Sequence, residues 1–71
     1  MWTDETLIEA MQLIISSERI ERVDASDSPY IVANGVPYVD ELYLKALDEL
    51  IRRGSLKLLN RMQDRDIFVP S

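Results

Sequence analysis

Pro37–Gly54 reads PYVDELYLKALDELIRRG and is the stretch that decides the fold. On a helix, at about 100° per residue, its apolar side chains form one broad face. The face consists of Val39, Leu42, Tyr43, Ala46, Leu47, Leu50 and Ile51. Pro37 suits the first helical turn, where a missing N–H costs no hydrogen bond, and Gly54 suits a left-handed cap at the end. A helix with so broad an apolar face needs cover on two sides, so we predict that it is the central element.

The remaining strip of this helix is charged and carries both signs. It contains Glu41, Lys45, Asp48, Glu49 and Arg52, and Arg53 follows it. Acidic residues placed four positions before basic ones stabilise a helix. The strip is therefore expected to face solvent.

A first helix is predicted near the N-terminus, over residues 4–16. Thr3 or Asp4 can cap it. Its apolar stripe consists of Leu7, Ile8, Ala10, Met11, Ile14 and Ile15. Trp2 is expected to fold back as an apolar anchor, with an exposed aromatic contact as the alternative.

The middle of the chain leaves alternatives open. Residues 18–24, ERIERVD, fit either a short helix or a short edge strand, and residues 25–29 form a turn or loop by composition. Residues 30–33 favour a strand, and Asn34-Gly35 is a strong hairpin signal. Val36–Val39 would then be the return strand, confined to an edge by Pro37. We favour the other interpretation, in which Asn34-Gly35 is the bend into the central helix.

The C-terminal segment predicts a β-hairpin. Residues 55–59 and 67–69 favour strands, and the polar residues 60–66 between them form the turn. The fold class expected from these elements is α+β, with two main helices packed against a small antiparallel sheet. Residues 1–71 form one small domain.

Composition excludes several kinds of chemistry. The chain has no Cys and no His, so disulfides, the usual zinc sites and a Ser–His nucleophile are excluded. Adjacent helical carboxylates such as Asp48 and Glu49 point about 100° apart and do not converge on one proton or metal ion. We therefore expect no catalytic residues, no metal and no cofactor.

The net charge of −5 is unevenly distributed. Residues 1–51 carry three basic and eleven acidic residues, whereas residues 52–71 carry five basic and two acidic residues. The basic set is a candidate surface for a protein partner or a nucleic acid: Arg52, Arg53, Lys57, Arg61 and Arg65. A candidate acidic contact face consists of Glu41, Asp48 and Glu49.

No apolar run approaches the roughly 20 residues that span a bilayer, and no signal-peptide pattern is present. We expect a cytoplasmic protein without a membrane segment. A domain this small buries only about 60% of the surface of its unfolded chain, so a homodimer is an open alternative.

The segment LYLKALDELIRRGSLKL, followed by NRMQDRDIFVP, resembles a winged-helix domain over about half of the chain. The resemblance implies that the helix before Gly54 is a recognition helix and that the hairpin with Arg61–Arg65 at its tip is a wing. Glu41, Asp48 and Glu49 depart from the pattern, because they would meet phosphates in a DNA groove.

The sequence favours a non-enzymatic interaction or regulatory protein that binds a macromolecule, and the partner that we expect is another protein. Small acidic inhibitors encoded by phages or mobile elements are a fitting context. The alternative is a winged-helix transcriptional regulator that binds DNA through Arg53, Lys57, Arg61 and Arg65.

Overall fold

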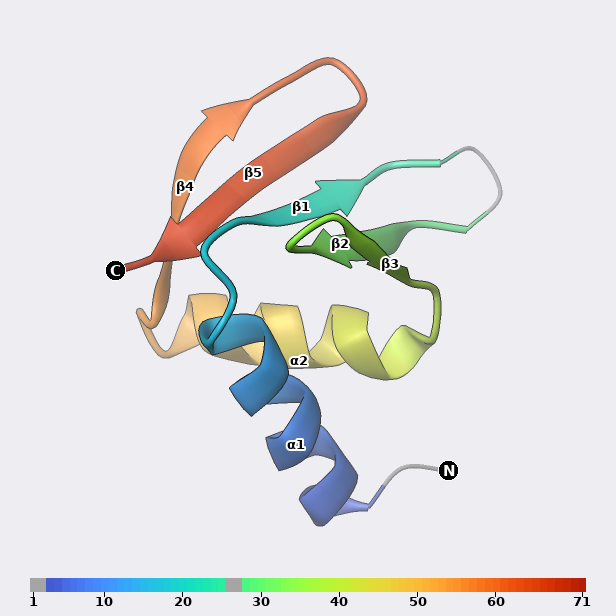
Figure 1. The fold of residues 1–71 in the computed structure, drawn as a ribbon, viewed down its shortest axis with the longest axis vertical. Coiled ribbons are helices and arrows are strands. Elements are labelled where there is room, and N and C mark those ends of the chain that lie inside the picture. The colour runs from blue at the N-terminus through green and yellow to red at the C-terminus, as the bar shows by residue number, and fades with distance from the viewer. Residues whose placement is uncertain (1–2, 26–27) are drawn as a thin grey trace.

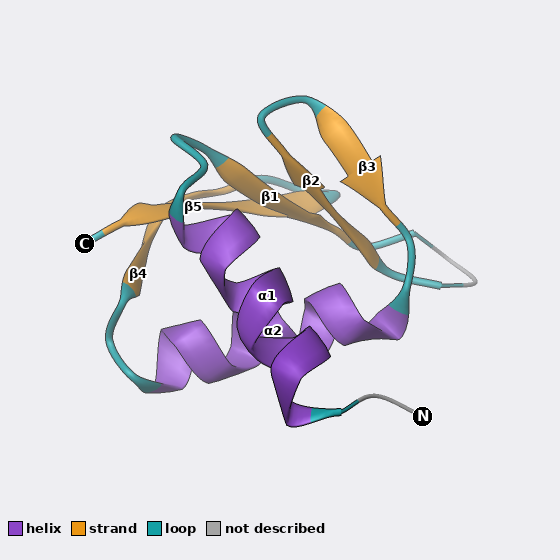
Figure 2. Cartoon of the chain, turned by 60° about the horizontal axis from the view of Figure 1, so that its bottom comes forward, coloured by secondary structure: helices purple, strands orange, loops and turns teal. Residues whose placement is uncertain are grey.

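The computed structural model describes residues 3–25 and 28–71, so the prediction for Trp2 lies outside the described residues. Two helices lie against one face of a five-stranded sheet (Figures 1 and 2). The elements are α1 (Asp4–Ile15), β1 (Ile20–Val23), β2 (Tyr30–Ala33), β3 (Val36–Tyr38), α2 (Glu41–Arg52), β4 (Leu56–Arg61) and β5 (Arg65–Pro70). The strand order is β3-β2-β1-β5-β4, and all neighbours are antiparallel. The predicted α+β class is confirmed.

Helix α1 has nearly the predicted bounds, but Ile8 and Ile15 of its predicted apolar stripe are 52% and 40% exposed. The Thr3 side chain caps it by accepting a hydrogen bond from the Thr6 N–H at 3.2 Å. Ala10, Met11 and Ile14 are buried and pack in the core with α2.

Helix α2 begins later than the sequence predicted. The Asp40 side chain accepts a hydrogen bond from the Leu42 N–H at 3.0 Å and caps the helix, so Pro37 and Val39 lie outside it. Val39 is 76% exposed instead of contributing to the apolar face. The predicted C-terminal cap is present: Gly54 has a φ of 76°, and the Ser55 N–H donates to the Leu50 carbonyl at 2.9 Å.

The segment before α2 forms a hairpin, and our favoured interpretation of it was wrong. Asn34 and Gly35 have φ values of 51° and 81°, as a two-residue turn between antiparallel strands requires. Pro37 lies in the edge strand β3, where its missing N–H is tolerated.

Residues 18–24 contain the central strand of the sheet, not a short helix or an edge strand. Ile20 pairs with Ala33 of β2 on one side and with Phe68 of β5 on the other. The region between α1 and α2 therefore supplies strands, and among its described residues there is no helix. The winged-helix resemblance rests on the second half of the chain alone.

The predicted C-terminal hairpin is confirmed, with longer strands and a shorter turn. Strand β4 contains a β-bulge between Leu58 and Asn60, and it forms one edge of the sheet. The core lies between the sheet and the helices. Its largest fully buried side chains are Ile14, Ile20, Ile31 and Leu47, each contributing about 1.5–3 kcal/mol through burial.

Candidate functional site

The C-terminal end of α2 brings together three of the predicted surface residues. Glu49 accepts hydrogen bonds from the guanidinium groups of Arg52 and, at 3.1 Å, Arg53. The hydrogen bond from Arg52 is the main reason that the pKa of Glu49 lies below its ordinary value. Two cations against one carboxylate leave this end of the helix positive.

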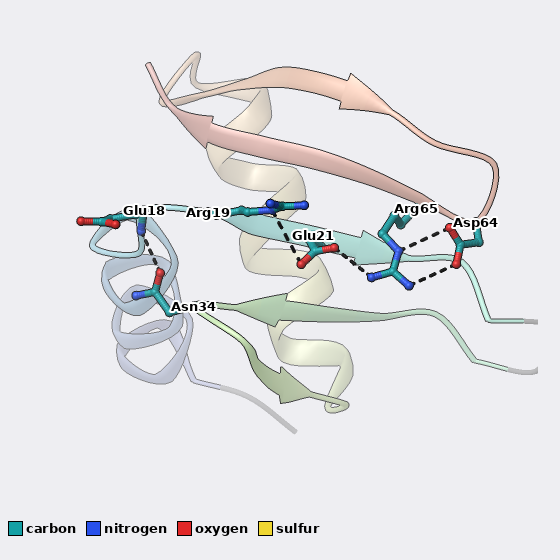
Figure 3. Close-up of polar contacts among 6 residues, drawn as sticks. All are labelled: Glu18, Arg19, Glu21, Asn34, Asp64 and Arg65. Carbon is teal, nitrogen blue, oxygen red and sulfur yellow. Dashed lines mark hydrogen bonds and ion pairs between the residues drawn. The ribbon is translucent and has the colours of Figure 1, made fainter.

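Arg65 belongs to a chain of ion pairs on the sheet face that the helices leave uncovered (Figure 3). Its guanidinium donates to Glu21 at 2.9 Å and to both carboxylate oxygens of Asp64 at 3.3 and 3.1 Å. Arg19 lies 3.8 Å from the other oxygen of Glu21. The hydrogen bonds to Asp64, and to a smaller extent the one to Glu21, raise the pKa of Arg65. The hydrogen bonds between Arg65 and Asp64 also lower the pKa of Asp64.

These ion pairs have a structural role. The cross-strand neighbours of Arg65 and Glu21 are Val23 and Ile67, which are only 8% and 4% exposed although neither of the two described helices covers this face. The long charged side chains shield the two apolar residues from water. The guanidinium group of Arg65 is therefore engaged in ion pairs that stabilise this face of the sheet.

On the opposite face, a polar groove runs beside α2. Arg22 lies over the Phe68 ring and pairs with Asp66 at 2.9 Å and Asp48 at 3.7 Å, while Arg61 pairs with Asp66 at 3.3 Å. A hollow of about 540 Å³ contains this network. A neighbouring hollow of about 510 Å³ shares Pro29, Leu44 and Asp48 with it and adds Glu41.

The charges of this groove neutralise one another. Asp66 is shared by Arg22 and Arg61, so each of its two carboxylate oxygens faces a guanidinium group. In residues 3–25 and 28–71, no three acidic, histidine or cysteine side chains cluster as metal ligands. The groove can provide shape and mixed hydrogen bonds to a partner.

The outer edge of β4 differs from the charged groove and the ion-paired sheet face, because large apolar side chains are exposed to solvent there. Leu58, Leu59 and Met62 are 44%, 61% and 49% exposed. Lys57 is also exposed, and it has no ion pair within the described part of the chain. We call Leu56–Met62 the β4 edge.

The structure distributes the predicted residues over four places. Arg52, Arg53 and Glu49 lie at the end of α2, Lys57 lies on the β4 edge, and Arg65 spans the uncovered face and the groove. Glu41, Asp48 and Arg61 line the groove. Sequence reasoning missed Leu58, Leu59 and Met62 as a surface, because nothing local indicates that the strand after α2 ends the sheet.

Comparisons with protein-family models, curated proteins and solved structures found no match. No helix in the described ranges has both the length and the apolar character needed to cross a bilayer.

Proposed function

We propose that this chain is a small regulatory protein that has no catalytic activity of its own and acts by binding another protein. The observation that carries the proposal is the β4 edge, where three large apolar side chains are exposed on or next to a strand that, among the described residues, pairs only with β5. Large apolar side chains that are exposed beside charged ones are typical of protein interfaces.

The ion pairs favour a protein partner over DNA. Arg53, Arg61 and Arg65 each have a carboxylate neighbour at 3.3 Å or less, which offsets their attraction for phosphates. The net charge of −5 also disfavours binding to DNA, because an acidic protein is repelled by phosphates.

The experiment is capture of proteins from a lysate of the source cells by the immobilised protein. Leu59→Asp places a charge in the exposed apolar surface, and Ile8→Asp on α1 is the matched control because Ile8 is 52% exposed. Both variants should fold, since surface substitutions usually change stability by about 0.5 kcal/mol or less. We expect Leu59→Asp to lose a protein that the wild type and Ile8→Asp retain. Equal retention by all three proteins would contradict the use of the β4 edge.

A further inference from the structure

The backbone of the β4 edge is paired on one side only. Among the residues that the structure describes, β4 hydrogen-bonds with β5 alone. The Ser55 carbonyl accepts from the Ser71 N–H at 3.1 Å, and the Met62 N–H donates to the Arg65 carbonyl at 2.7 Å. Ser55 and Met62 therefore point their backbone groups toward β5.

Hydrogen-bonding direction alternates along an antiparallel strand. Counting inward from Ser55 and Met62, the backbone groups of Leu56, Leu58 and Arg61 point outward, with the bulge at Leu59 between them. The β4 edge thus offers donors and acceptors to an added strand.

The opposite edge of the sheet does not offer the same opportunity. Strand β3 has three residues, and Pro37 in its middle lacks an N–H. Short strands and proline are among the features by which proteins block edge pairing. β4, with six residues and no proline, is the edge that can accept a strand.

Charge decides which strand fits. Lys57 of β4 has no ion pair among the described residues, and Arg52 and Arg53, just before β4 in the chain, share the single carboxylate of Glu49. Asp66, the partner of Arg61, is shared with Arg22. The rim of the edge is therefore positive, although the protein as a whole is acidic.

A second copy of this chain is a poor occupant. Pairing two β4 edges would bring two positive rims together, and like charges on neighbouring strands are destabilising. The bulge and Lys57 discourage such self-association further. A strand with alternating apolar and acidic residues satisfies the backbone, covers Leu58 and Leu59, and neutralises the rim.

We propose that the β4 edge binds an extended acidic segment of a protein partner as a sixth strand of the sheet. This inference rests on the proposed function and specifies its mode of binding. Main-chain hydrogen bonds would supply affinity, and the exposed leucines and the cations would supply selectivity.

The test uses two synthetic eight-residue peptides, one of alternating valine and glutamate and one of alternating valine and lysine, added to the ¹⁵N-labelled full chain. We expect the glutamate peptide to cause saturable shifts at the amides of Leu56, Leu58 and Arg61 and to slow their hydrogen exchange. The lysine peptide should cause neither effect. Reversing the rim with Lys57→Glu and Arg61→Glu should weaken binding of the glutamate peptide about tenfold.

Leu58→Pro removes an outward N–H without breaking a hydrogen bond to β5, so the sheet should remain folded. Leu58→Val keeps the N–H and is its matched control. Loss of peptide binding in Leu58→Pro but not in Leu58→Val supports strand addition. Equal binding by the two variants, or no shifts at the edge with either peptide, overturns it. If a protein is still captured by wild type and Leu58→Pro alike, the proposed function survives and only this mode of binding fails.

Discussion

Gly54 and the Asn34–Gly35 pair place the backbone in left-handed conformations where the chain must reverse direction. Gly54 has a φ of 76°, and a Cβ added there would meet nothing within 4 Å. The requirement for glycine is therefore conformational and not steric, since L-residues are strained in this region.

Gly54→Ala should lower the free energy of unfolding by about 1 kcal/mol because alanine is strained at this φ. Urea denaturation followed by circular dichroism would measure the change. Gln12→Ala, on the exposed side of α1, is the control and should change stability by about 0.5 kcal/mol or less. A Gly54→Ala protein as stable as the wild type would indicate a different end to α2.

Some residue-scale features could be predicted from sequence and others could not. Gly54 was predictable because a helical pattern ends directly before it. Asn34-Gly35 correctly indicated a hairpin, but Pro37 also fits the first turn of a helix, so the sequence alone did not separate a hairpin from a bend into α2. In the structure the Asp40 side chain accepts a hydrogen bond from the Leu42 N–H, so α2 begins after Asp40 and leaves Pro37 in a strand.

At the scale of elements, strand β1 depends on ion pairs with residues far away in the chain, which the sequence pattern of residues 18–24 cannot reveal. Glu21 and Arg22 place two charges in the central strand, and each finds its partner 44 residues away, in Arg65 and Asp66. These long-range ion pairs allow a charged segment to occupy the middle of the sheet. Residues 18–24 alone could not reveal that arrangement.

The end of α2 predicts a titration that can be measured directly. Arg52 and Arg53 lower the pKa of Glu49, so replacing both with alanine should move the Glu49 titration toward its ordinary value of 4.5. Carboxyl carbon NMR across acid pH would follow it. An unchanged midpoint in the double variant would show that the arginines do not hold Glu49.

The sign of the effect on stability follows from the direction of the shift. A lowered pKa in the folded state stabilises the protein above the unfolded value, and this contribution is lost as the pH falls through the folded pKa. Because Glu49 pairs with exposed arginines, high salt should weaken the effect.

At the scale of the whole molecule, the charges are divided between an acidic first part and a basic C-terminal part. The fold pairs some of the basic residues, Arg61 with Asp66 and Arg65 with Glu21 and Asp64, whereas Lys57 has no ion pair within the described residues. The charge distribution was predictable from the sequence, but the pairing required the register of β1, β4 and β5.

The wild-type protein should not retard mixed duplex DNA, even at low salt, because its net charge is −5 and its hairpin arginines are paired. Electrophoretic mobility at low and moderate salt would test this expectation. Retardation that salt abolishes and that Arg61→Ala with Arg65→Ala weakens would instead favour the winged-helix regulator.

The most direct test of the central claim is partner capture by immobilised Leu58→Pro and Leu58→Val proteins, compared side by side. The two variants share the loss of the leucine and differ in the outward N–H of the β4 edge. Binding by strand addition predicts that the valine protein retains the partner and the proline protein loses it. Equal retention by both folded proteins would contradict the claim that the partner binds this edge by strand addition.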